Sequence, residues 1–402
     1  MNDFLYSIPA EVIFGELKEK TLIKYLNKYK ASKVLLIYGK NSIKKNGLYE
    51  LITSALKSSE IDFYELAGVN PNPDITDVAR GCELVTSHKI DLLLAVGGGS
   101  TIDCAKAIAC SSGSDTDPWE TLMSRPRLKT AIPIGVVLTT AATGSEMNAN
   151  YVISNRKTQE KVAFNQPVLK PSFVFADPKY TFGISKYQTA SGASDILAHL
   201  LEQYFDSHDD DGVTDRMIEG VMQSVLHYTP VALNEPTNYE ARSNLMWASS
   251  LALSTLFFCG KKTGGDWGSH TIEHQISAIY DIAHGAGLAI VFPNTLKYFL
   301  QKDIQENLSL IKFHNLAVNV FHLNPADFKN EESLANECIN LFTEFFKSIN
   351  MPTTLREVNI TDEHFGEMAR KSQLYKSIGK YHLLDADAVL KILNMSLQSN
   401  FY

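Results

Sequence analysis

Apolar runs alternate with helical segments over about the first 110 residues of the chain. The runs at 33–38 and 90–96 are almost wholly apolar, which is typical of parallel strands buried on both faces. Residues 61–66 read as a further strand, and the segments at about 43–58 and 75–88 have the apolar spacing of helices. This order predicts a doubly wound α/β fold with a largely parallel sheet.

The pattern changes near residue 183. Extended pieces continue up to that point, and the most apolar of them is 132–138. From about Ser185 onward nearly every segment has helical spacing, and few runs resemble strands. We therefore expect an α/β domain over 1–183 and an all-α domain over 184–402.

Composition excludes several classes of protein. A chain of 402 residues with 45% hydrophobic and 20% charged residues is ordinary for a globular protein of two domains. The net charge of -8 argues against a nucleic-acid binder. No uncharged apolar run reaches the roughly 18 residues of a membrane span, and the first residues lack a secretion signal. Five cysteines without C-x-x-C spacing indicate reduced thiols and a cytoplasmic location.

A glycine-rich turn follows the apolar run that ends at Val96. It consists of Gly97, Gly98, Gly99 and Ser100, and a helical segment begins directly after it. Glycines let the backbone approach a ligand closely, and the N-terminus of a helix offers free N–H groups. The turn therefore predicts a pyrophosphate site at the end of a parallel strand, although its spacing is neither G-x-G-x-x-G nor a P-loop.

A hydroxyl-rich loop follows the next apolar run, at 132–138. Its side chains are those of Thr139, Thr140, Thr143 and Ser145. Such a loop can donate hydrogen bonds to a phosphate or a ribose, although the same residues also cap ordinary turns.

The segment after the run 33–38 bears on the choice of nucleotide. Gly39, Lys40, Asn41 and Ser42 stand where an acidic side chain would hold a ribose 2′-hydroxyl in a dinucleotide fold. No carboxylate occurs between Gly39 and Asn46, whereas lysines do. This tilts the expected cofactor toward NADP(H) over NAD(H).

Five candidate metal ligands lie in the helical half: Asp195, His199, His270, His274 and His284. The first pair and the second pair each have i, i+4 spacing, which directs both side chains of a pair to one helix face. A carboxylate and imidazoles on facing helices can bind a divalent cation. The stretch 270–274 also fits H-x-x-E-H, so a zinc peptidase with Glu273 as general base is an alternative. A peptidase, however, leaves the glycine turn and the hydroxyl-rich loop unexplained.

Over essentially its whole length the chain resembles the iron-containing (group III) alcohol dehydrogenases, nearest to the branch of NADPH-dependent butanol dehydrogenases and aldehyde reductases. The motifs that carry the resemblance are Phe14-Gly15, the glycine turn with Asp103, Asp117-Pro118-Trp119, the stretch 142–148, Asp177-Pro178 and the metal-ligand stretch 195–284.

The resemblance implies a dehydroquinate synthase-like fold, with dinucleotide-binding residues in 1–183 and metal-binding residues in 184–402. It implies Fe²⁺ or Zn²⁺ bound by Asp195, His199, His270 and His284. His274 then moves to the substrate side as a catalytic residue, with a role in a proton relay or in positioning the substrate. The remaining residues implied at the cofactor are Asp103, which would also act in catalysis, Thr139, Thr140, Ser145 and, at the ribose of the nicotinamide, Lys161.

The expected reaction is reversible hydride transfer between NADP(H) and a small aldehyde or primary alcohol of the butanal/butanol kind. An NAD(H)-dependent polyol or glycerol-type dehydrogenase is the alternative within related families. The resemblance also implies a homodimer, formed through the extended segment around Val12.

Overall fold

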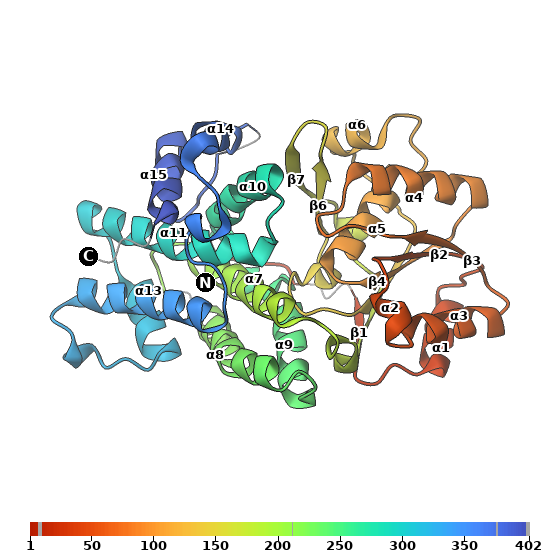
Figure 1. The fold of residues 1–402 in the computed structure, drawn as a ribbon, viewed down its shortest axis with the longest axis horizontal. Coiled ribbons are helices and arrows are strands. Elements are labelled where there is room, and N and C mark those ends of the chain that lie inside the picture. Colours follow the sequence, from red (N-terminus) through yellow and green to blue (C-terminus); the bar gives the residue numbers. More distant parts are fainter. Residues whose placement is uncertain (7–9, 211, 375–376, 399–402) are drawn as a thin grey trace. The chain divides into compact units, whose positions relative to one another are not determined.

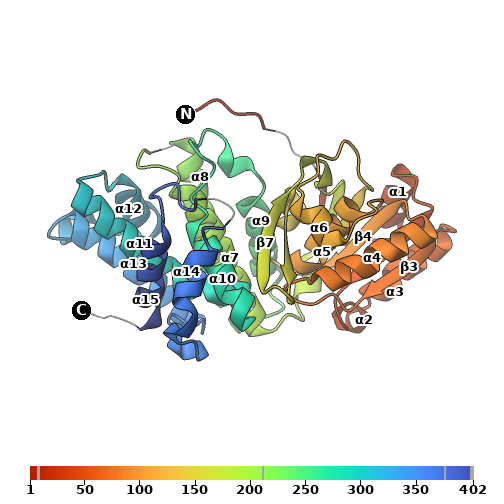
Figure 2. The ribbon, with the colours of Figure 1, turned by 90° about the horizontal axis from the view of Figure 1, so that it is seen from above.

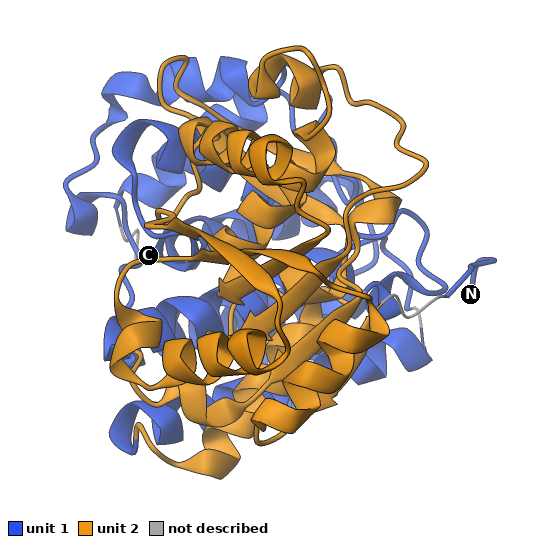
Figure 3. Cartoon of the chain, turned by 90° about the vertical axis from the view of Figure 1, so that its right-hand side faces the viewer, with its two compact units in different colours: residues 1–6, 185–235, 255–402 blue, residues 7–184, 236–254 orange. Residues whose placement is uncertain are grey.

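The computed structural model describes residues 1–6, 10–210, 212–374 and 377–398. These residues form two compact units (Figure 3). We call Ser7–Ile184 with Pro236–Ser254 the α/β unit, and Met1–Tyr6, Ser185–Glu235 and Thr255–Tyr402 the helical unit.

The α/β unit is built on a six-stranded sheet with the order β1-β8-β5-β4-β2-β3. All neighbouring strands in this sheet are parallel, as the sequence predicted (Figure 1). The strands are β1 Glu11–Phe14, β2 Lys33–Tyr38, β3 Asp62–Ala67, β4 Leu92–Gly97, β5 Ile134–Leu138 and β8 Phe173–Ala176.

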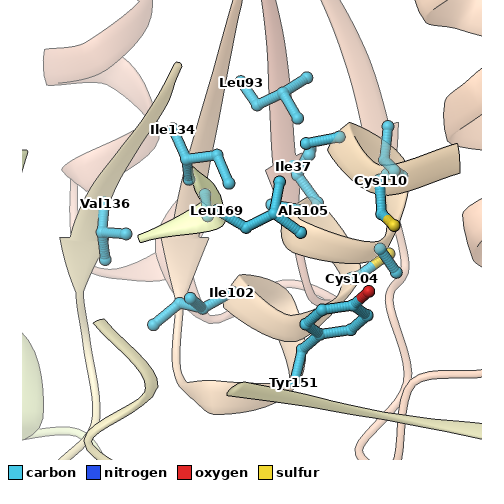
Figure 4. Close-up of a cluster of buried hydrophobic side chains, with 14 of the residues drawn as sticks. Ile37, Leu93, Ile102, Cys104, Ala105, Cys110, Ile134, Val136, Tyr151 and Leu169 are labelled. Atoms are coloured by element: carbon cyan, nitrogen blue, oxygen red, sulfur yellow. The ribbon is translucent and has the colours of Figure 1, made fainter. Parts of the chain in front are cut away.

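Helices cover both faces of this sheet, as Figure 1 shows. They are α1 Glu19–Lys28, α2 Ser42–Lys45 and α3 Leu48–Ser58 on one side, and α4 Ile75–His88 and α5 Gly99–Ser111 on the other, with the short α6 Pro118–Met123 packed on α5. Along β2, Val34 and Leu36 belong to the core beneath α1 and α3, whereas Leu35 and Ile37 belong to the core beneath α4 and α5. Figure 4 shows the second core. Burial on both faces explains why the strand is apolar at nearly every position.

Two local features differ from the expectation. The helix expected at about 43–58 is split into α2 and α3, because Gly47 has φ +78, in the left-handed region. The extended piece at 150–155 pairs with a strand that the sequence did not reveal. These strands, β6 Asn150–Asn155 and β7 Glu160–Asn165, form an antiparallel hairpin (Figure 2).

The helical unit is organised around α11, which is buried along most of its length. This helix packs against α7, α10, α13 and α15. The helices of the unit are α7 Lys186–Tyr204, α8 Val213–Asn234, α10 Gly268–Tyr280, α11 His284–Glu306, α12 Ile311–Asn315, α13 Glu331–Ser348, α14 Phe365–Lys371 and α15 Ala386–Leu397. Among the described helices, none combines the length and the apolar character that a membrane crossing requires.

The expected domains 1–183 and 184–402 differ from the two units at two segments, of which the first is Met1–Tyr6, part of the helical unit. Residues 236–254, which contain α9 Tyr239–Ala252, group with the α/β unit rather than with the other helices. Met246 of α9 lies in the core beneath α4 and α5, and Ser250 donates a hydrogen bond of 2.7 Å to the buried Glu146. The helical spacing of 239–252 predicts a helix, but it does not indicate whether that helix packs in the α/β unit or in the helical unit.

Candidate active site

Three of the four predicted metal ligands form a compact buried group. Asp195 and His199 lie one turn apart on α7, and His270 lies on α10; one ligand-type atom from each falls within 4.8 Å of the others. His284, the first residue of α11, has its Nε2 atom 3.7 Å from Oδ1 of Asp195. Its ring centroid is 5.4 Å from that of His270. The four side chains therefore converge, although they come from three helices.

Three of the candidate ligand atoms are buried and lack hydrogen bonds. Asp195 Oδ1, His199 Nδ1 and His270 Nε2 have no hydrogen-bond partner among the described residues. The 3.6 Å between His199 Nδ1 and Asp195 Oδ1 is too long for one. Each such group costs about 1–3 kcal/mol when it is left unsatisfied. One carboxylate and three imidazoles are a donor set that fits Fe²⁺ or Zn²⁺.

The protonation state of His199 also suits a ligand. Burial lowers the pKa of its imidazole to about 3, despite the opposing charge of Asp195. The ring is therefore neutral at ordinary pH, and a neutral imidazole has the lone pair that metal binding requires.

Two buried glutamates orient the candidate ligands, a role that the sequence pattern predicted for neither of them. Oε1 of Glu202 accepts hydrogen bonds from the backbone N–H of His270 at 3.0 Å and from its Nδ1 at 3.1 Å. Oε2 of Glu273 accepts from Nδ1 of His284. Both glutamates are buried, and they fix the Nδ1–H tautomer that leaves Nε2 available to a metal. The available signal was spacing, since each glutamate stands three residues after a ligand histidine.

The contacts of Glu273 argue against the peptidase alternative. Its second oxygen, Oε1, accepts from the hydroxyl of Ser277, so both oxygens are engaged. A Cβ added at Gly287 on α11 would lie 2.7 Å from Cγ of Glu273, which shows how closely the two helices enclose it. A general base must reach a water molecule next to the metal, and an enclosed carboxylate that orients His284 is not arranged for that task.

Replacing Glu273 by Gln is expected to lower metal affinity by about 10–100-fold, because the amide cannot accept from both His284 and Ser277. Competition between the protein and a coloured chelator for Zn²⁺ measures this change. The matched control is Glu306→Gln, which changes an exposed glutamate at the end of α11. Equal affinity of both variants and the wild type would show that Glu273 does not support the site.

His274 lies next to His284, one of the four candidate ligands. The side chain is half-buried on α10, and its ring centroid is 5.4 Å from that of His284. With Glu273 and His284 it forms a second group of metal-type side chains, which shares His284 with the four candidate ligands. Its role on the substrate side stays a prediction.

The glycine turn and the hydroxyl-rich loop lie against each other in the α/β unit. Gly97 of β4 is paired with Leu138 of β5, so the loop and the turn leave neighbouring strand ends. A Cβ at Gly98 would lie 2.1 Å from Oγ1 of Thr140, and a Cβ at Gly99 would lie 2.3 Å from Oγ1 of Thr143. Helix α5 begins here without a side-chain cap, which leaves N–H groups for an anionic ligand.

Asp103 and Ser145 hold the hydroxyl-rich loop in place. Ser145 Oγ donates to Asp103 Oδ1 at 2.6 Å, and the backbone N–H of Val152 donates to Oδ2 at 2.9 Å. The buried Lys106, for which the sequence pattern predicted no role, donates to Ser145 O at 2.6 Å and to Asn150 O at 2.7 Å. Burial lowers the pKa of its ammonium to about 8. These contacts favour a positioning role for Asp103 over direct participation in catalysis.

The remaining predicted cofactor residues lie at two places in the α/β unit. Gly39, Lys40, Asn41 and Ser42 follow β2, whose residue Tyr38 is paired with Val96 of β4. Residues 39–42 therefore begin beside the end of β4, where the glycine turn starts. Lys40, Asn41 and Ser42 are exposed. Lys161 is half-buried on β7, opposite Ser154 of β6.

The helical unit contains another group of metal-type side chains, whose members form hydrogen bonds with one another. His208 Nε2 and His382 Nε2 both bond Asp303 Oδ1, at 2.9 and 2.6 Å, and the hydroxyl of Tyr381 donates to Oδ2 at 2.7 Å. Burial acts to raise the pKa of Asp303, but these hydrogen bonds hold it below its ordinary value. The arrangement is a hydrogen-bonded clasp that ties the segment around Tyr381 to α11, in contrast to the unbonded ligand atoms around Asp195.

The chain is similar to known proteins over its full length. It matches the iron-containing alcohol dehydrogenase family over residues 9–178, and the C-terminal part of the Fe-containing alcohol dehydrogenase family over 189–397. It is 41% identical to NADH-dependent butanol dehydrogenase B of Clostridium acetobutylicum, covering 99% of this chain and 100% of that protein. It is 32% identical to the NADPH-dependent aldehyde reductase YqhD of Escherichia coli, covering 98% and 99%.

Solved structures agree with these matches. The crystal structure of NADH-dependent butanol dehydrogenase A from Thermotoga maritima superposes with a TM-score of 0.93 at 34% identity, and the match covers 99% of each chain. The family resemblance and the fold class inferred from the sequence are thereby confirmed. The chain is an alcohol or aldehyde oxidoreductase that belongs to the iron-containing alcohol dehydrogenase family.

Proposed function

We propose that the protein reduces small aliphatic aldehydes with NADPH, and oxidises the corresponding primary alcohols, at a divalent ion held by Asp195, His199, His270 and His284. The observation that carries this proposal is the convergence of buried ligand atoms that lack hydrogen bonds. Fe²⁺ or Zn²⁺ bound there would act as a Lewis acid toward the charge that develops on the substrate oxygen.

The residues around the ligands would prepare the site and move the proton. Asp195 supplies a negative charge that favours a divalent cation, and Glu202 and Glu273 orient two of the imidazoles. We assign proton transfer to His274, because it is half-buried and its ring lies beside that of His284.

The α/β unit would hold the nucleotide. The uncapped N-terminus of α5, at Gly98–Ser100, offers N–H groups and a positive dipole end to the pyrophosphate. The hydroxyls of Thr139, Thr140 and Thr143 would donate to the phosphate and the ribose, and Lys161 would reach the ribose of the nicotinamide. The nucleotide and the substrate must be bound at the same time, because the hydride passes directly between them and no protein side chain carries it.

For the nucleotide we propose a preference for NADP(H). The relatives differ in this respect, since the Clostridium enzyme is named as NADH-dependent and the Escherichia enzyme as NADPH-dependent. The physical support is local: Lys40 is exposed just after β2, and residues 39–46 contain no carboxylate to repel a 2′-phosphate.

The replacement Lys40→Asp is expected to lower kcat/KM for NADPH by about 10–100-fold, because a charge-assisted contact worth roughly 1.5–3 kcal/mol becomes a repulsion. The value for NADH should stay the same or rise, because an acidic side chain at this place can accept a hydrogen bond from the ribose 2′-hydroxyl. Initial rates with both nucleotides and butanal measure the ratio, and Lys57→Asp on α3 controls for a charge change at another exposed lysine. A wild-type enzyme that prefers NADH would contradict the nucleotide proposal.

The direct test of the function is oxidation of NADPH in the presence of butanal, followed by its absorbance. A glycerol-type dehydrogenase would instead reduce NAD⁺ with glycerol, and a peptidase would cleave casein without a nucleotide. Loss of activity on chelation and its return with Fe²⁺ or Zn²⁺ would support the metal assignment. Full activity in metal-free protein would overturn it.

For the assembly we propose a homodimer in which β1 pairs with its counterpart in a second copy. Strand β1 lies at an edge of the sheet, and an edge strand offers unpaired backbone groups for such pairing.

A further inference from the structure

An unusual backbone conformation precedes the helix that carries His270. Trp267 has φ 62 and ψ 14, in the left-handed region that residues with a Cβ rarely adopt. Its indole Nε1 donates to the carbonyl of Gly264 at 2.9 Å. A Cβ at Gly265 would lie 2.8 Å from that nitrogen, so the glycine makes room for the indole. The surrounding loop therefore holds this ring in one position.

The ring borders two of the metal ligands. Its centroid is 5.4 Å from that of His270 and 6.3 Å from that of His199. Phe258 packs edge-on against it, with centroids 6.1 Å apart. The two histidines are buried, whereas Trp267 and Phe258 are only half-buried. The indole N–H already donates to the carbonyl of Gly264, so the exposed surface of the two rings is apolar.

We propose that Trp267 and Phe258 form the wall against which the alkyl chain of the substrate packs, which makes the enzyme selective for aliphatic aldehydes of several carbons. This inference rests on the function proposed above, because it needs a carbonyl that reacts at the ligand group. Aromatic faces favour methylene groups, whereas the hydroxyls of a polyol would lose their hydrogen bonds to water there. The left-handed conformation of Trp267 fits such a role, since strained residues gather at functional sites.

The test compares kcat/KM for acetaldehyde, propanal and butanal. In the wild type we expect a rise of about fourfold for each added methylene. Trp267→Gly removes the ring at a position whose backbone conformation glycine adopts freely, so the start of α10 should be preserved. This variant should lose the dependence on chain length, so that the ratio of kcat/KM for butanal to kcat/KM for acetaldehyde falls from about sixteen toward one. Trp267→Phe should keep most of the dependence.

Metal content per chain, measured for every variant, separates this role from mere support of the histidines. If Trp267→Gly lowers the rates of all aldehydes by the same factor, or loses the metal, the ring supports the ligands and the proposal is overturned. If that variant does not fold, Phe258→Leu takes its place and should weaken the chain-length dependence. If the wild type is active but its kcat/KM does not depend on chain length, the proposed wall is wrong and the proposed function stands. If the wild type does not reduce aldehydes, the proposed function is wrong as well.

Discussion

His270→Ala is expected to abolish metal binding and aldehyde reduction together. The imidazole is buried, and its Nε2 is one of the candidate ligand atoms that have no hydrogen-bond partner among the described residues. Its removal also takes away one of the donors to the buried Glu202, whose negative charge then has fewer partners. Lewis-acid stabilisation is worth several kcal/mol, so we expect kcat/KM to fall by roughly a thousandfold or more.

Metal analysis and initial rates on the same preparation test this prediction. His227→Ala is the control, because His227 is an exposed histidine on α8 of the same unit. The control should keep both metal and activity. If His270→Ala loses the metal but still reduces butanal, the metal has no part in the reaction.

Gly285→Ala is expected to displace the start of α11 from α7. A Cβ at this position would lie 1.9 Å from the backbone oxygen of Ser191 and 2.7 Å from its carbonyl carbon, and neither atom can rotate away. Ser191 lies one turn before Asp195, and Gly285 directly follows His284. A shift that relieves the clash therefore also lengthens the 3.7 Å separation between Asp195 and His284.

We expect a loss of about 1–3 kcal/mol in the free energy of unfolding of the metal-free protein, as for other overpacked sites, and weaker metal binding. Denaturant titration and metal titration measure the two effects. Gly220→Ala on α8 is the matched control, because the added Cβ would come within 4 Å of no described residue beyond its chain neighbours and the surrounding helix backbone. There, replacement of a helical glycine should stabilise the protein by roughly 0.5–1 kcal/mol. A stable, metal-replete Gly285→Ala variant would contradict the close approach of the two helices.

Local pattern was enough to predict the sheet and to propose most of the ligands. A strand buried on both faces, such as β2, must be apolar at nearly every position, and that signal is strong. Likewise, i, i+4 spacing placed Asp195 and His199 on one face of α7 without any knowledge of the fold. The exclusion of His274 from the ligand set came from the family resemblance, because spacing treats it like His270.

Features that depend on contacts between distant segments could not be predicted. Glu273 supports His284 across two helices, and its position in H-x-x-E-H suggested a different chemistry. The short strand β7 is recognisable only by its pairing with β6. The position of the Trp267 ring depends on its contacts with Gly264 and Gly265, and a propensity for helix or strand gives no information about such contacts.

The placement of α9 has a consequence for the order in which the protein folds during synthesis. The ribosome completes the six-stranded sheet at Ala176, but the α/β unit still lacks Met246 and the partners of Ala142, Glu146 and Asn148 on 236–254. Those residues emerge only after α7 and α8 have been made. During synthesis, part of the core of the α/β unit therefore stays exposed until residues 236–254 have been made and α9 packs onto it.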